Sequence, residues 1–123
     1  VGNEPTHGDF HEGQIHVARG RICGVLDVDT IGPGRRADDL ACLVAHLSTI
    51  QHMTPRQTAR VHALIREWVP VFDRRVDPVE LRLRSAAVVI SLATGPYRGQ
   101  EPDWEAETRR MVDSAEALVR QVR

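Results

Sequence analysis

Two short apolar runs on either side of a four-residue turn limit what the first part of this 123-residue chain can fold into. The runs are 15–17 and 22–26, and the turn segment between them, 18–21, contains a glycine. Short runs of this kind around a glycine turn predict a β-hairpin. The residues that flank the hairpin, Gln14 and Asp27, would then lie at the same end of it.

The rest of the chain has the apolar spacing of helices. We expect a first helix over 37–50, with one buried face, and a second that begins at Thr54-Pro55. Asp77-Pro78, with an acidic residue at position 80, predicts a third start by a capping box. Because residues 86–93 are apolar nearly all round, this third helix is expected to be the central one. The first two stripes comprise Leu40, Leu43, Val44, Leu47 and Ile50, then Val61, Leu64, Ile65, Trp68 and Val69.

The last helix is expected to begin at about Asp103. Gly95-Pro96 should end the preceding helix, and Pro102 should precede the new one. The polar residues between them, 97–103, are expected to form a loop that could line a substrate site. The predicted fold is therefore mainly α, a small β-hairpin followed by about four helices.

The flanks of the hairpin carry two polar motifs. His7-Gly8-Asp9 opens the segment HGDFHEGQ, in which Gln14 follows Asp9 by five residues, and Asp27 follows Asp9 by eighteen. Kinase-type phosphotransferases place a catalytic aspartate, a metal-binding amide and a metal-binding aspartate in this order. An amide oxygen and a carboxylate are hard ligands suited to Mg²⁺, which leaves Asp9 to orient a hydroxyl and accept its proton.

Together with two further elements, these motifs resemble the C-terminal lobe of the aminoglycoside phosphotransferase and choline kinase-like family. The further elements are the glycine-rich link 31–36 and Asp39-Leu40-Ala41. The resemblance implies a protein-kinase-like fold and transfer of phosphate from ATP, with Mg²⁺, to a hydroxyl group of a small molecule. It assigns the base to Asp9 and the metal ligands to Gln14 and Asp27. The acceptor would be an aminoglycoside, an amino sugar or a sugar.

Two positions depart from the family pattern. The family usually has asparagine where Gln14 stands, and often an aromatic residue where this chain has Val28. Glutamine keeps the amide oxygen but adds one methylene, so more rotamer freedom is lost when it binds a metal. The segment HGDFHEGQ is also similar to that of bacterial maltokinases, in which glutamine occupies this position, so a sugar is a candidate acceptor.

Other polar residues are given supporting roles. We expect His7 to brace the catalytic loop by hydrogen bonds. Asp39 resembles the family's aspartate that ties the first helix to this loop, although an acidic residue there also suits the helix dipole. Three acidic residues are candidates for contact with a cationic or polyhydroxylated substrate: Glu12, Glu101 and Asp103.

The chain contains no lysine, because all sixteen of its basic residues are arginine. Kinase-like enzymes hold the α- and β-phosphates with a lysine and a glycine-rich turn of the N-terminal lobe. We therefore expect residues 1–123 to be the C-terminal, catalytic and substrate lobe, with the ATP-binding lobe absent. Alone, this lobe should be inactive and should self-associate through the surface that the other lobe would cover.

Composition excludes some classes of partner. The formal net charge is −1, and the arginines are scattered, which argues against a nucleic-acid surface. No apolar run is long enough to span a membrane.

Cys23 and Cys42 lie in apolar runs without metal-binding spacing and are expected to be reduced core residues of a cytoplasmic protein.

Two alternatives remain open from the residues alone. His7, Asp9 and His11 share one face if the segment is a strand, and such a group can ligate zinc in a metal-dependent hydrolase. This alternative leaves Gln14 and Asp27 without a role. The other alternative is a non-catalytic kinase-like module, for which the unusual Gln14 is the argument.

Overall fold

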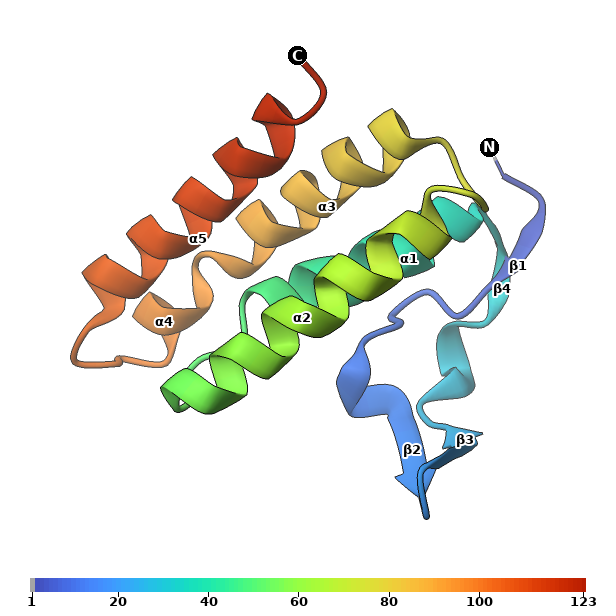
Figure 1. The fold of residues 1–123 in the computed structure, drawn as a ribbon, viewed down its shortest axis with the longest axis horizontal. Helices are drawn as coiled ribbons and strands as arrows, with labels where there is room; N and C mark the ends of the chain where they lie inside the picture. The colour runs from blue at the N-terminus through green and yellow to red at the C-terminus, as the bar shows by residue number, and fades with distance from the viewer. Residues whose placement is uncertain (1) are drawn as a thin grey trace.

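The computed structural model describes residues 2–123 as two small antiparallel β-sheets followed by helices that run back and forth beside one another (Figure 1). The strands are β1 (Glu4–Thr6), β2 (Ile15–Ala18), β3 (Arg21–Val25) and β4 (Gly32–Gly34). The helices are α1 (Arg36–Ser48), α2 (Pro55–Phe72), α3 (Pro78–Leu92), the single turn α4 (Gly95–Arg98) and α5 (Trp104–Arg120). Two 3₁₀ turns, η1 (Glu12–Gln14) and η2 (Val28–Thr30), flank the β2–β3 hairpin.

The predicted hairpin is confirmed as β2 and β3. Ile15 pairs with Val25 and Ala18 with Arg21, and a bulge lies between His16 and Val17. The two turn residues, Arg19 and Gly20, both have positive φ, 52° and 73°, as the two-residue turns that match strand twist require. The side chains of this hairpin are largely exposed, so it projects from the helices rather than covering them.

The second sheet was not predicted. It pairs β1 with β4, so that Glu4 lies opposite Gly34, and the Thr6 hydroxyl donates to the Gly32 carbonyl at 3.0 Å. A Cβ on Gly34 would lie 2.8 Å from Thr6 Oγ1, which explains why the glycine-rich link suits this close approach. This sheet holds the start of the chain next to the beginning of α1.

Local capping chemistry sets the starts of α2 and α3 as expected. Thr54 and Gln57 form a complete capping box before α2, with Pro55 at its first position. Before α3, the Asp77 carboxylate accepts the Glu80 amide hydrogen at 2.8 Å. Only this half of the predicted box forms, because the Glu80 side chain instead pairs with Arg35 and Arg84.

α3 is the central helix, as its all-round apolar sequence predicted. It packs against both α1 and α5, and small side chains allow the helices to approach closely. None of the helices in residues 2–123 is both long and apolar enough to cross a membrane. The buried cluster consists of Ala45 from α1, Ala86, Val89 and Ala93 from α3 and its end, and Met111 and Ala115 from α5.

Four of the five residues of the predicted stripe of α2, all except Leu64, are half-buried, and none is fully buried. The helix before Gly95-Pro96 ends at Leu92, as expected. Two expectations were wrong. The loop expected over 97–103 is helical at its start, because Tyr97 and Arg98 belong to the turn α4, where Pro96 suits a first-turn position. Cys23 is exposed on the hairpin rather than in a core, and both cysteines are free thiols.

Candidate active site

The loop between β1 and β2 is held in place by a glycine and a threonine. Gly8 has φ of 93°, and a Cβ there would lie 2.9 Å from Thr30 Cβ, so only glycine fits. The Thr30 hydroxyl donates to the His7 carbonyl at 2.6 Å. The loop that carries Asp9 is thereby fastened to η2, which follows Asp27.

His7 is buried and uses both ring nitrogens within the loop. Its Nδ1 accepts the Asp9 amide hydrogen at 3.2 Å, and its Nε2 lies 2.8 Å from the Leu26 carbonyl oxygen. Because Nδ1 is an acceptor, the neutral ring carries its proton on Nε2 and donates it to Leu26. The imidazole therefore connects the backbone at Asp9 to the end of the hairpin next to Asp27.

Asp39 connects the first turn of α1 to the same loop. Its two carboxylate oxygens accept the amide hydrogens of His7, at 2.7 Å, and Gly8, at 3.1 Å. Hydrogen bonds from backbone amides to a carboxylate are stronger than those between neutral groups. Asp39 thus links the loop that carries Asp9 to the start of α1.

Gln14 brings the two candidate catalytic carboxylates together. Its side-chain nitrogen donates to Asp27 Oδ2 at 3.1 Å and lies 3.5 Å from Asp9 Oδ2. The hairpin produces this arrangement, since Gln14 directly precedes β2 and the Leu26 amide donates to the Gln14 carbonyl at 2.7 Å. The expected meeting of Gln14 and Asp27 at one end of the hairpin is confirmed.

The backbone of Asp27 is held in an unusual conformation. Its φ and ψ are 55° and 59°, in the left-handed region that glycine adopts freely and that asparagine, aspartate and histidine adopt more often than other residues. Asp27 also precedes η2 without capping it by a side-chain hydrogen bond. Conformations of this kind cost free energy and are concentrated at functional sites. The Asp27 carboxylate accepts from the Gln14 side chain and not from the start of η2.

The donors present suit Mg²⁺. With the Gln14 nitrogen directed at the two carboxylates, its Oε1 accepts no hydrogen bond from residues 2–123. The carboxylates of Asp9 and Asp27, together with the Gln14 amide oxygen once the amide is rotated to face them, are the hard oxygen ligands that Mg²⁺ prefers. We therefore find that the residues at this end of the hairpin fit a magnesium ion.

Two residues of α1 that the sequence analysis missed also face the Asp9 loop. His46 stacks on His11, with ring centroids 4.4 Å apart and an interplanar angle of 17°. Burial, followed by the nearby acidic groups Asp9, Asp39 and Glu12, raises the pKa of the Cys42 thiol to about 11. Burial and the neighbouring His11 lower the pKa of His46. Cys42 and His46 follow Asp39 by three and seven residues, so all three lie on one face of α1. This spacing is the feature of the sequence from which their position near the Asp9 loop could have been predicted.

The structure does not provide the zinc site of His7, Asp9 and His11 that the hydrolase alternative requires, although Asp9, Cys42 and His46 lie close enough together to hold an ion. Both ring nitrogens of His7 already have partners, so it has no lone pair for a metal. His11 and His46 each lie near Glu12 in a group that could hold an ion. However, a metal binds in the plane of an imidazole, and two nearly parallel stacked rings cannot both point at one ion.

Of the three acidic residues proposed for substrate contact, the structure brings one to the site. Glu12 lies beside His11 and His46, and its Oε2 is buried without a hydrogen-bond partner among the described residues. Glu101 instead lies 3.5 Å from His52 Nε2, and Asp103 precedes α5. Figure 1 shows the α4–α5 connection at the opposite side of the molecule from the β2–β3 hairpin.

Comparison with known proteins is consistent with this arrangement. The profile of the phosphotransferase enzyme family (APH) matches residues 4–76, which is more than half of the chain. The chain belongs to this family. No curated protein and no solved structure matches it. The matched region contains both β-sheets, the complete Asp9 loop, α1 and α2.

Membership of the APH family gives the fold and the general chemistry. It implies a protein-kinase-like fold and a kinase-like enzyme that transfers a phosphoryl group. Enzymes of the family typically use ATP with Mg²⁺, which agrees with the oxygen donors at Gln14 and Asp27. The match ends at residue 76, so α3 and α5, which complete the helical core, lie beyond it.

Proposed function

We propose that this APH-family chain provides the catalytic base and the magnesium ligands of an ATP-dependent kinase that phosphorylates a hydroxyl group of a small molecule. The observation that carries the proposal is the contact of Gln14 with both Asp9 and Asp27. The hairpin accounts for the meeting of Gln14 with Asp27, and the loop before it adds the carboxylate of Asp9 to the same place. A base and two metal ligands would have to lie together in this way.

Asp9 is proposed as the base, acting through Oδ1. Both Gln14 and His11 approach the other oxygen, Oδ2, at 3.5 Å and 3.8 Å. Oδ1 would then be free to accept the proton of an acceptor hydroxyl while it orients that hydroxyl for attack. Gln14 and Asp27 would hold Mg²⁺, which when bound neutralises charge on the phosphates of ATP.

We further propose that residues 1–123 act as the C-terminal lobe of this kinase. The chain has no lysine to hold the α- and β-phosphates, so a second polypeptide segment must supply one. The exposed apolar residues of the hairpin support this division, because Val17 is 58% and Ile22 70% exposed. Purified residues 1–123 should therefore transfer no phosphate from ATP, and robust activity would contradict the division.

The proposed acceptor is an amino sugar, an aminoglycoside or a sugar such as maltose. Glu12 supports this class, because its buried and unpartnered Oε2 would accept a hydrogen bond from an ammonium or hydroxyl group. The similarity of HGDFHEGQ to the maltokinase segment supports a sugar. Glu101 and Asp103 are not included, since their contacts place them with the α1–α2 turn and at the start of α5.

The test is a phosphorylation assay with the complete enzyme, ATP and Mg²⁺. The acceptors are aminoglycosides, amino sugars, maltose and choline, and phosphate incorporation is followed by mass spectrometry. We expect phosphorylation of a hydroxyl in one of the first three classes and loss of that product in Asp9→Asn. Turnover of choline alone would contradict the acceptor class, and equal turnover by Asp9→Asn would contradict the catalytic role.

A further inference from the structure

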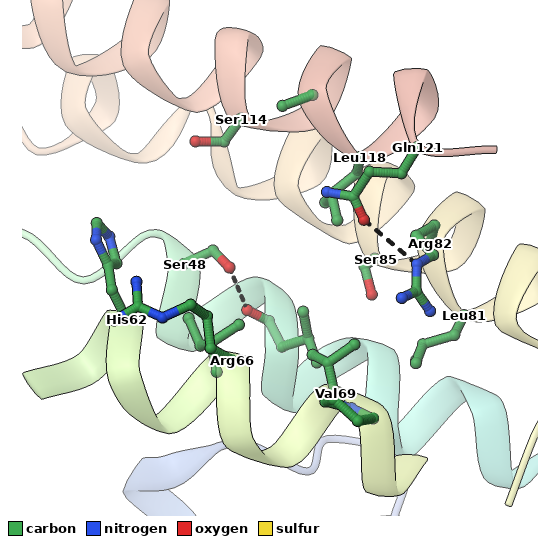
Figure 2. Close-up of a pocket in the computed structure, with 14 residues that line it drawn as sticks. Ser48, His62, Arg66, Val69, Leu81, Arg82, Ser85, Ser114, Leu118 and Gln121 are labelled. Carbon is green, nitrogen blue, oxygen red and sulfur yellow. Dashed lines mark hydrogen bonds between the residues drawn. The ribbon is translucent and has the colours of Figure 1, made fainter. Parts of the chain in front are cut away.

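A cavity that is separate from the Asp9 loop lies among α1, α2, α3 and α5 (Figure 2). Its volume is about 470 Å³, within the range of about 300–1,000 Å³ that is typical of small-molecule sites. Asp9, Gln14 and Asp27 do not line it. On α1, Cys42 and His46 face the Asp9 loop, whereas Val44 and Ser48, each two residues further on, line the cavity.

Part of the apolar stripe of α2 lines this cavity. Ile65 and Val69 line it from α2, Leu81 from α3 and Leu118 from α5. No residue of α2 is fully buried, although α1 and α3 each contribute several buried residues. An apolar group that filled the space would remove these side chains from water and stabilise the fold.

Ser85 provides a polar group inside the cavity. It is 0% exposed, and its hydroxyl has no hydrogen-bond partner in residues 2–123. Two other helical serines, Ser48 and Ser91, donate to backbone carbonyls of their own helix at 2.7 Å and 2.6 Å. A buried hydroxyl left unpaired costs about 1–3 kcal/mol. Because Ser85 lines the cavity, a bound polar atom would remove this cost.

The side chains that line the cavity favour an anionic ligand over a cationic one. The chain has seventeen acidic residues, yet no aspartate or glutamate lines the cavity. Its cationic lining residues are Arg66 and Arg82, and His62 lines it as well. Arg82 is bound to both carboxylate oxygens of Asp73, whereas Arg66 makes no ion pair within the described part of the chain. Figure 2 shows His62 and Arg66 next to each other on α2.

We propose that this cavity binds a small carboxylic acid with an apolar body and a hydroxyl group. The apolar body would lie between α2 and the pair α3 and α5. The hydroxyl would pair with Ser85, and the carboxylate would pair with Arg66 at the exposed edge. This site is independent of the phosphotransfer site, so neither proposal requires the other.

Three probes with the same carbon chain separate the parts of this proposal: ω-hydroxyoctanoate, octanoate and octanol. Binding to the 123-residue chain is measured by NMR titration of backbone amides. We expect ω-hydroxyoctanoate to bind most tightly, with shifts centred on α2 and α3. Tighter binding of octanol, shifts centred on the hairpin, or no saturable binding in the millimolar range would overturn the proposal.

Variants assign the two polar contacts. Arg66→Gln should weaken binding of both carboxylates by about two- to fivefold, the range of an exposed ion pair, and leave octanol unchanged. Arg60→Gln makes the same charge change on α2 outside the cavity and should have no effect. Ser85→Ala should reduce ω-hydroxyoctanoate to the affinity of octanoate.

A cavity-filling variant provides an independent measurement. Ser114 lines the cavity from α5 and is not fully buried, so Ser114→Phe should occupy the space without disrupting the core. We expect this variant to raise the unfolding temperature and abolish binding of all three probes. A stable Ser114→Phe protein that binds ω-hydroxyoctanoate normally would place the probe elsewhere and refute the site.

Discussion

The side-chain nitrogen of Gln14 lies 3.1 Å from Asp27 Oδ2, so the residue before β2 and the second residue after β3 meet at the open end of the hairpin. The extra methylene of glutamine, relative to the usual asparagine, lengthens the reach of the amide to this carboxylate. In the structure the amide nitrogen of Gln14, and not its oxygen, faces the Asp27 carboxylate. Rotation of the amide by about 180° would bring the oxygen to this position, which the role of a shared metal ligand requires.

The proposed role of Gln14 as a metal ligand can be tested by removing its side-chain amide or by shortening the side chain by one methylene. In the complete enzyme, Gln14→Ala should raise the Mg²⁺ concentration needed for half-maximal activity, because one oxygen ligand is lost. Gln14→Asn should retain partial or full function, since the amide oxygen remains. The measurement is a magnesium titration at saturating ATP. An unchanged magnesium requirement in Gln14→Ala would remove this residue from the metal site.

Asp9 and Asp27 should differ in what they contribute. Asp9→Asn should lower kcat by about 10²- to 10⁴-fold, the usual contribution of a positioned base, with nearly unchanged ATP affinity. Asp27→Ala should weaken Mg²⁺-dependent nucleotide binding as well as kcat. Steady-state kinetics and nucleotide titrations separate these effects. Equal losses of ATP affinity in the two variants would argue against distinct roles.

Asp39 should matter for stability as well as for catalysis. Asp39→Ala leaves the amides of His7 and Gly8 without their carboxylate acceptor, which should cost about 1–3 kcal/mol of unfolding free energy. Asp38→Ala is the matched control on the same turn. Its carboxylate is 50% exposed and pairs with Arg84, so its loss should cost at most about 1 kcal/mol. Equal destabilisation in urea denaturation would contradict the bracing role.

Elements with local causes were predicted from the sequence, and those that depend on distant contacts were not. Gly20 allows the hairpin turn, and Thr54 and Asp77 cap their own helices, so neighbouring residues are sufficient to indicate these features. The β1–β4 pair joins segments 26 or more residues apart and lacks an alternating apolar pattern. The spacing of His46 from Asp39 places both on one face of α1, but the packing of this face on the Asp9 loop depends on distant contacts.

The lowered pKa of His46 predicts a pH dependence of stability. As pH falls below 6.5, the ordinary value, the unfolded chain takes up a proton at His46 before the folded chain does. The free energy of unfolding should therefore decrease from about pH 6.5 down to the lowered pKa of the folded state. His46→Gln should flatten this slope, and His16→Gln, at an exposed hairpin position, should not. Urea denaturation at several pH values measures the slope of the unfolding free energy against pH. Identical slopes in the two variants would contradict the prediction.

The exposed apolar surface of the hairpin predicts self-association of residues 1–123. Ile22 is 70% exposed and lies with other exposed apolar residues of the hairpin and η2, and contiguous apolar surface of this kind favours association. Light scattering should show a dimer or larger species that Ile22→Glu converts to monomer. Ile90→Glu, at a 50% exposed position of α3, is the control and should leave the assembly intact. A monomeric parent chain would show that the hairpin does not associate, and dissociation by Ile90→Glu alone would place the interface on α3.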